Sequence, residues 1–327
     1  MVNRISIKYR LAMLVYVTCL AGLQMFIKIN IWCLAGTILF FAIVVGMITL
    51  KKGKPGKSPP PDRRYFPFVS VIIAAHNEEK VIAETIKQAF ALRYHKSGKR
   101  NYEVWVINDR STDRTAEIVE GMKHRYPVNV LHRDSSELPG KAAALNHCLP
   151  LTAGEVLLTL DADALFPEDL ISKAVAYLAP ELVGGAQVVK RIINPDTNFL
   201  CARQADEYKI SVGIQQGRDS IGGTVEFKGN GSFIKRSALE SVGGWTNHTV
   251  TEDLDLSTKL LLAGYRIRFV AGTWVGEQAA PDYQSFVRQR LRWIEGSMLR
   301  YLTYFQDLLT SRMHPLLRSD MLFFAAE

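Results

Sequence analysis

The chain has 327 residues, a formal net charge of +8 and a hydrophobic fraction of 48%. This length allows one large catalytic domain with additional segments. The positive charge alone does not indicate a nucleic-acid partner. No basic face with interleaved aromatic side chains accompanies it, which argues against nucleic acid. The four cysteines form no Cys-x-x-Cys or Cys/His pattern, so the sequence also excludes a cysteine-based zinc site.

Two uncharged apolar runs lie near the start of the chain, at residues 11–27 and 31–50. A membrane-spanning helix needs about 17–25 apolar residues, so we predict a transmembrane helical hairpin over residues 1–50. Lysine and arginine are concentrated on both flanks of the hairpin and are sparse in its turn, which places both flanks in the cytoplasm. We therefore expect an integral multi-pass membrane protein that is anchored in the lipid bilayer and has a cytoplasmic catalytic domain.

The segment 51–65 is rich in lysine and proline and is predicted to be an extended linker. Basic residues near anionic lipid headgroups contribute about 1 kcal/mol each, so the linker is suited to hold a domain against a membrane surface. A solvated topology signal is an equally good interpretation.

From residue 66 the chain alternates apolar strand-like runs with amphipathic helix-like runs. Strands are predicted over 68–76, 102–109, 128–132 and 155–163, and helices over 78–92, 112–125 and 141–149. This alternation predicts an α/β fold with a doubly wound, mostly parallel sheet. Ligands of such sheets bind beyond the carboxyl ends of the strands. The polar residues that fall there are His76, Asn77, Asn108, Asp109, Asp161 and Asp163.

Asp161 and Asp163 end the predicted strand 155–163. Residues i and i+2 share one face of a strand, and two like charges side by side repel. A divalent cation such as Mg²⁺ or Mn²⁺, bridging to a diphosphate, would stabilise the pair. Asp109, at the end of another predicted strand, offers an acceptor to the N–H groups of a base or the hydroxyls of a ribose.

The later half of the chain carries two further polar clusters. Glu252 and Asp253 lie in the first turn of a predicted amphipathic helix, where compensation of the helix dipole is the simpler interpretation for Glu252. The run "RQRLRW" (288–293) clusters arginines on a predicted helix, which suits phosphate binding or a solvated basic face.

Beyond that cluster, residues 294–315 are predicted to form an amphipathic helix. Such a helix lies at a membrane interface or packs on the domain core, and the sequence favours neither. A further apolar segment starts within 316–327, so the chain is expected to be part of a longer protein.

Four motifs together resemble the inverting glycosyltransferases of family 2, which have the GT-A fold. They are Asp109, "DAD" (161–163), "TED" (251–253) and "QRLRW" (289–293). The resemblance covers about residues 66–305, with a catalytic domain expected over 66–293. One departure is Arg110, where many members carry glycine, so the geometry of the uridine loop does not transfer from the family.

The resemblance implies a role for each matched residue. Asp253 is expected to be the general base, and Asp163 with Asp161 is expected to hold Mg²⁺. The residues expected to bind the nucleotide sugar are Asp109, Lys141, Asp161 and Arg292. Those expected to contact the acceptor or the sugar are Glu252, Gln289, Arg290 and Trp293.

Within the family, residues 198–208, 222–245 and 288–305 resemble the synthases of β-monoglucosyldiacylglycerol. This implies transfer of glucose from UDP-glucose to 1,2-diacylglycerol, or to another membrane acceptor. The same motifs serve processive synthases of β-polysaccharides such as cellulose, hyaluronan or poly-N-acetylglucosamine, which need more transmembrane helices after the site. A non-enzymatic nucleotide-sugar sensor is a weaker alternative, because a pure binder has no use for a base at Asp253.

Overall fold

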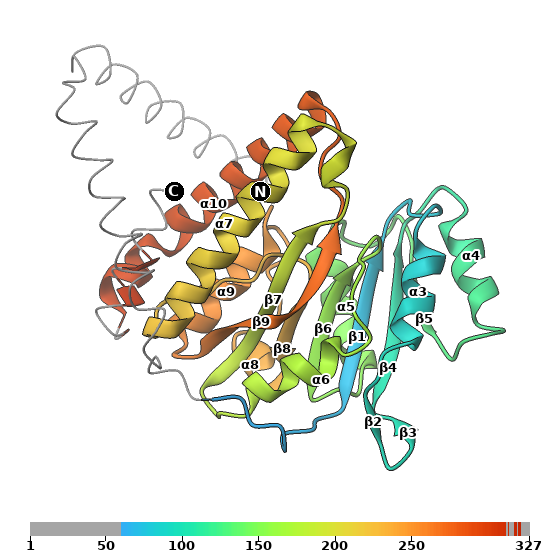
Figure 1. Ribbon diagram of the computed structural model, residues 1–327, viewed down its shortest axis with the longest axis horizontal. Coiled ribbons are helices and arrows are strands. Elements are labelled where there is room, and N and C mark those ends of the chain that lie inside the picture. The colour runs from blue at the N-terminus through green and yellow to red at the C-terminus, as the bar shows by residue number, and fades with distance from the viewer. Residues whose placement is uncertain (1–59, 312, 314–316, 319, 322–327) are drawn as a thin grey trace. The chain divides into compact units, whose positions relative to one another are not determined.

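A seven-stranded sheet forms the centre of the computed structural model, which describes residues 60–311, 313, 317–318 and 320–321. The strand order is β5-β4-β1-β6-β8-β7-β9 (Figure 1). All neighbours pair in parallel except β8, which is antiparallel to β6 and β7. The predicted α/β fold with a mostly parallel sheet is confirmed.

The strands are β1 (Val69–Ala75), β2 (His95–Lys96), β3 (Lys99–Arg100), β4 (Tyr102–Asp109), β5 (Asn129–Arg133), β6 (Val156–Asp161), β7 (Val183–Ile192), β8 (Ser232–Lys235) and β9 (Arg266–Glu277). The α-helices are α3 (Ile82–Phe90), α4 (Thr115–Met122), α5 (Lys141–Cys148), α6 (Leu170–Val175), α7 (Phe199–Ile221), α8 (Arg236–Ser241), α9 (Glu252–Leu262) and α10 (Tyr283–Thr310). Short 3₁₀ turns are η2 (Leu149–Leu151), η3 (Ala176–Leu178) and η4 (Pro195–Thr197).

Helices cover both faces of the sheet, so its central strands are apolar on both sides. Val71 and Ile73 of β1 belong to a core that also contains residues of α3, α4 and α6. Ile72, which points the opposite way, belongs to a second core with residues of α5, α8 and α9. The carboxyl ends of the parallel strands β1, β4, β5 and β6 therefore meet at one edge, between these two helical layers.

The two longest helices, α7 and α10, lie beside this edge (Figure 1). Each begins with a side-chain cap: Asn198 accepts from the Cys201 N–H at 2.9 Å, and Asp282 accepts from the Ser285 N–H at 2.8 Å. Such caps satisfy N–H groups that a helix leaves without partners. The segment predicted as a separate helix from residue 294 is the second half of α10, so the domain boundary expected at 293 falls within a continuous helix.

Among the described residues, no helix is both long enough and apolar enough to cross a membrane. The physical reason is that α7, with 23 residues, and α10, with 28, carry charged side chains along their length. This finding contradicts the prediction of an integral multi-pass membrane protein with a cytoplasmic catalytic domain. The predicted hairpin over 1–50, most of the linker 51–65 and most of the segment 316–327 lie outside the described residues.

Candidate active site

Asp161 and Asp163 lie on either side of the end of β6. The strand ends at Asp161, so Asp163 belongs to the turn that follows. This corrects the expectation of a strand over 155–163 with both carboxylates on one strand face. The buried hydroxyl of Thr85 in α3 donates to the Ala162 carbonyl at 2.6 Å, and this contact holds the turn that separates the two carboxylates.

Lys141, the first residue of α5, joins this turn to the start of α9. Its ammonium lies 2.5 Å from Asp161 Oδ1 and 3.7 Å from Glu252 Oε1. It also donates to the Gly229 carbonyl at 2.8 Å. Burial opposes the charge, but the Asp161 and Glu252 carboxylates outweigh burial and raise the pKa of Lys141. Three residues that the sequence singled out, from three separate elements, thus lie together.

Asp253 lies in the first turn of α9. Burial, followed by the neighbouring Glu252 carboxylate, raises the pKa of Asp253 to about 6. Gly229 approaches it closely: a Cβ at this position, where φ is +78°, would lie 3.3 Å from Asp253 Oδ2. A glycine is suited to both the positive φ and the space left beside the carboxylate. Burial and then Asp161 also raise the pKa of Asp163.

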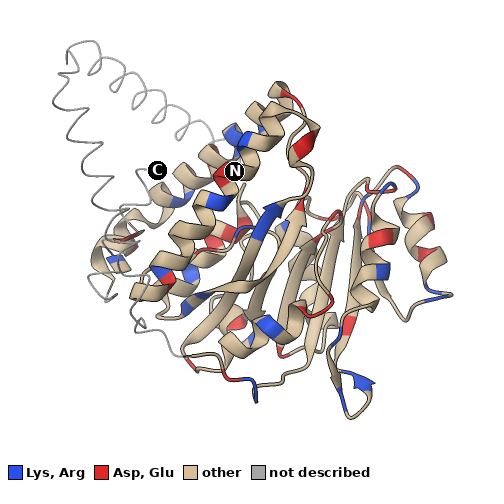
Figure 2. Ribbon diagram, in the orientation of Figure 1, with Lys and Arg blue, Asp and Glu red and all other residues tan. Residues whose placement is uncertain are grey.

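A partly buried lysine, which the sequence did not single out, faces the same carboxylates. Lys190, near the end of β7, pairs with Glu277 at the end of β9 at 2.6 Å. Glu277 also accepts a short hydrogen bond from the Tyr208 hydroxyl of α7. The Lys190 charge lowers the pKa of Asp253 against the effect of burial. Both acidic and basic residues accordingly lie around this end of the sheet (Figure 2).

Asp109 ends β4, which is separated from β6 by β1. Its Oδ1 accepts from Arg133 Nη1 at 2.7 Å and from Arg110 Nε at 2.9 Å, and its Oδ2 accepts from Arg110 Nη2 at 3.3 Å. The Asp109 carbonyl lies 2.6 Å from His76 Nδ1. Asp109 is therefore held between two guanidinium groups, apart from the cluster around Asp161.

The four predicted residues of α10 have different surroundings. Arg290 forms two bonds of 2.7 Å with the Glu207 carboxylate of α7, and its guanidinium lies 4.4 Å from the centre of the Trp293 ring. Among the described residues, the side chain of Gln289 has no hydrogen-bond partner. The exposed side chain of Arg292 forms neither a hydrogen bond nor an ion pair with a described residue. The structure thus gives Arg290 a role in joining α10 to α7 and leaves Arg292 free to meet a ligand.

The carboxylates fit a divalent cation that shares its coordination with a phosphate. Within the described part of the chain, no three His, Cys, Asp or Glu side chains form a ready-made metal site. Magnesium, however, takes only one or two protein carboxylates and leaves its other positions to phosphate and water. The half-buried carboxylate of Asp163, which forms no ion pair with a described residue, and the adjacent Asp161 supply that number.

Some of the residues that sequence reasoning missed carried a usable signal. Arg133 ends β5 and belongs to the same set of parallel strand ends as Asp109, so the strand-end rule would have found it. Glu277 ends β9 and Lys190 lies near the end of the paired strand β7, but neither strand was recognised from the sequence. Tyr208 lies among mostly polar residues of α7, and nothing in its local sequence marks it.

A family model described as "Glycosyltransferase like family 2" matches residues 67–296 of the chain. A β-monoglucosyldiacylglycerol synthase of Nostoc sp. is 40% identical over 259 residues, which cover 79% of this chain and 55% of that protein. A poly-β-1,6-N-acetyl-D-glucosamine synthase of Staphylococcus aureus is 29% identical over 252 residues, covering 76% of this chain and 59% of that protein. The chain thus spans little more than half the length of these curated relatives.

A solved mannosyltransferase of Pyrobaculum calidifontis, in complex with GDP-Man and Mn²⁺, has the same fold. The TM-score is 0.74 at 24% sequence identity, and the match covers 89% of this chain and 79% of that one. At this level of identity the likeness concerns the arrangement of helices and strands and supports the GT-A fold predicted from the sequence.

Proposed function

Since the chain belongs to glycosyltransferase family 2, we propose that it transfers glucose from UDP-glucose to the free hydroxyl of 1,2-diacylglycerol and forms β-monoglucosyldiacylglycerol. The observation that carries this proposal is the meeting of Lys141, Asp161 and Glu252 beside the partly buried Asp253. The 40% identity to the Nostoc synthase supports the choice of sugar and acceptor.

The donor lies across the carboxyl ends of β4, β1 and β6 in this proposal. Asp109 receives the base or the ribose, and Asp161 and Lys141 lie where the diphosphate arrives. Lys141 then turns its ammonium from Asp161 toward the phosphates, and exposed Arg292 adds a second cation from α10. Fixed cations of this kind are effective because they need little reorganisation as charge develops on the leaving group.

Asp163 and Asp161 are the residues that would hold Mg²⁺ or Mn²⁺. When bound, the cation would neutralise charge on the departing nucleoside diphosphate. The Mn²⁺ in the mannosyltransferase complex is consistent with a divalent ion in this fold.

Asp253 acts as the general base. Its carboxylate takes the proton of the acceptor hydroxyl, whose oxygen forms the new bond to C1 of glucose while the bond from C1 to the diphosphate breaks. A base is most effective when its pKa is near the working pH, and burial has raised the pKa of Asp253 to about 6. Attack opposite the leaving group inverts C1, so an α-linked donor yields a β-glucoside.

An apolar acceptor is compatible with the surface of α10. Its outward face exposes Leu291, Ile294, Leu302, Phe305 and Leu309. The role of residues 294–315 as an interfacial helix stays a prediction. Trp293, with Glu252 and Gln289, would contact the sugar or the acceptor.

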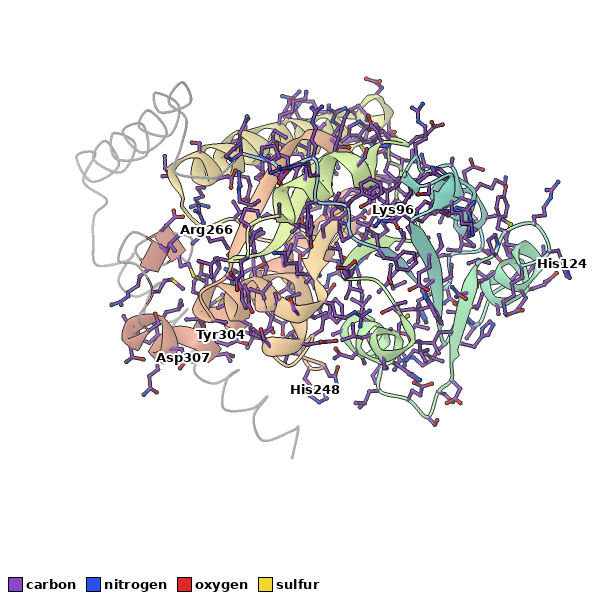
Figure 3. The ribbon with its side chains drawn as sticks, turned by 90° about the horizontal axis from the view of Figure 1, so that it is seen from below. Lys96, His124, His248, Arg266, Tyr304 and Asp307 are labelled. Carbon is purple, nitrogen blue, oxygen red and sulfur yellow. The ribbon has the colours of Figure 1, made fainter. Side chains whose placement is uncertain are left out.

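The test is product formation by purified protein in detergent with Mg²⁺, UDP-glucose and diacylglycerol, comparing wild type, Asp253→Asn and Asp307→Asn. Asp307 is a matched control, because it is exposed on α10 near Tyr304 (Figure 3). We expect a single-sugar glycolipid from wild type and Asp307→Asn, and none from Asp253→Asn. Chelation by EDTA should abolish the product, and added Mg²⁺ or Mn²⁺ should restore it.

The alternative is a processive β-polysaccharide synthase, which the similarity to the Staphylococcus enzyme favours. The same assay decides between them when UDP-N-acetylglucosamine is supplied in parallel. A polymer that depends on Asp253, without any glycolipid, would replace the lipid glucosyltransferase proposal.

A further inference from the structure

Arg110, which follows β4 directly, has a backbone conformation that side chains rarely adopt. Its φ is +59°, in the left-handed region that only glycine and a few polar residues enter readily. The conformation is held by the neighbouring strand end, because the Arg110 N–H donates to the Arg133 carbonyl at 3.1 Å. Strain of this kind at the edge of a site points to a function for the side chain.

The backbone conformation turns the Arg110 guanidinium back onto Asp109. Arg110 is not the sole partner of this carboxylate, because Arg133 also pairs with Asp109 at 2.7 Å. Arg133 is itself fixed by Glu137 at 3.0 Å and by the Leu138 carbonyl at 2.6 Å, and its side chain is only 2% exposed. Arg110 is 27% exposed, and among the described residues its Nη1 has no hydrogen-bond partner.

The position of this pair assigns it to one end of the donor. Asp109 ends β4 and Asp161 ends β6, with β1 between them. Neighbouring strands are about 4.8 Å apart, so the two strand ends are separated by about 10 Å. When the diphosphate of the donor lies at Asp161, as in the proposed function, Asp109 and Arg110 lie beside the nucleobase of the donor.

We propose that Arg110 determines base specificity: its guanidinium donates to a carbonyl oxygen of the base, while Asp109 accepts from the adjacent ring N–H. Uracil presents this combination, because its N3–H lies between two carbonyl groups. Cytosine presents the reverse, with a lone pair at N3 and an amino group at C4, so it would set a lone pair against the carboxylate and a donor against the guanidinium. This inference rests on the proposed function and deepens it toward uridine diphosphate sugars.

Guanine also carries a ring N–H beside a carbonyl group. Asp109 and Arg110 would therefore recognise this arrangement of donor and acceptor and not the size of the nucleobase. CDP is therefore the discriminating competitor, since it differs from UDP only in this pattern. Affinities of UDP and CDP are to be measured by calorimetry on the full chain in detergent with Mg²⁺.

The variant to test is Arg110→Gly, and the matched control is Ser97→Gly. Ser97 also has a positive φ, +51°, but lies in the turn between β2 and β3 at the other end of β4. Glycine suits both backbone positions, so both variants should fold, which their melting temperatures will verify.

We expect wild type and Ser97→Gly to bind UDP at least tenfold more tightly than CDP. Arg110→Gly should weaken UDP binding about tenfold, the order expected for one hydrogen bond from a charged donor, and should leave CDP nearly unchanged. In turnover, Arg110→Gly should raise the KM for the UDP-sugar with little change in kcat, because the base is bound alike before and during reaction.

Unchanged or tighter UDP binding by Arg110→Gly would overturn the inference, since Arg110 would then only cover Asp109. An unaltered ratio of UDP to CDP affinity would overturn it as well. Failure of wild type to bind any nucleoside diphosphate would instead remove the proposed function and this inference with it.

Discussion

The two ends of the candidate site differ in how their carboxylates are neutralised. At the end of β4, Asp109 is held by Arg133 and Arg110. At the other end, Asp253 and Asp163 form no ion pair with a described residue, and burial raises the pKa of each. At the first end, the folded chain itself neutralises the carboxylate. At the second end, the negative charge of the carboxylates is left for a proton, a cation or a substrate to neutralise. Unneutralised carboxylates lower the stability of the fold, and such a loss of stability is common at sites where activity competes with stability.

Removing Arg133 should have the largest effect on stability. Arg133→Met leaves Asp109 with only the partly exposed Arg110, and breaking one partner of a buried pair costs about 3–5 kcal/mol. Chemical denaturation measures the loss. A cost below about 1 kcal/mol would show that Arg110 alone neutralises Asp109 and that the two ends do not differ as described.

Asp253→Asn should have the opposite sign at neutral pH. The folded pKa of about 6 exceeds the ordinary value of 3.8, so wild type loses stability as the pH rises from about 4 through about 6 and the carboxyl group of Asp253 becomes charged. In EDTA at pH 7.5 the variant should be more stable by about 2–3 kcal/mol, and the gain should shrink toward zero by about pH 4. A gain that does not change with pH would mean that charge is not its cause.

Lys190→Met should shift the pH dependence of activity. Without this cation, the pKa of Asp253 rises further, so the acidic limb of the kcat profile should move to higher pH. Lys235→Met is the matched control, because Lys235 is half-buried at the opposite end of the sheet, paired in register with Val156 at the start of β6. Equal profiles for the two variants would remove Lys190 from the site.

Glu207→Gln should have the smallest effect. The pair with Arg290 links α7 to α10, but the Glu207 side chain is 51% exposed, and such pairs contribute about 0–1 kcal/mol. The melting temperature should fall by no more than a few degrees, with UDP affinity unchanged. A large loss would place this link among the structural supports of the site.

The sheet and one half of the site were predictable because both follow local patterns. Apolar runs alternating with amphipathic helices define β1, β4, β5 and β6, and parallel strand ends then bring Asp109 and Asp161 to one edge. The short strand β8 can be recognised after its glycine-rich turn, but its antiparallel place between β6 and β7 could not be predicted, because tertiary pairing sets it. Lys190 and Tyr208 were not predictable for the same reason: their partner Glu277 is distant in sequence, and only the pairing of β7 with β9 brings them together.

The contact between Gly296 and Thr251 connects α10 to the start of α9, where Asp253 lies. A Cβ at Gly296 would lie 2.4 Å from Thr251 Cγ2, so the backbone of α10 rests directly on the residue before Glu252 and Asp253. The Tyr304 hydroxyl also donates to Asp255 at 2.9 Å, which ties α10 to α9 a second time.

The position of the base is therefore set from outside the pocket as well as within it. In the proposed mechanism, a displacement of α10, whose outer face exposes Ile294 and Phe305, would also move Asp253 relative to the sugar carbon. The position of α10 and the position of Asp253 are thus coupled. In the proposed mechanism, binding of the acceptor at α10 would also align Asp253 for proton transfer.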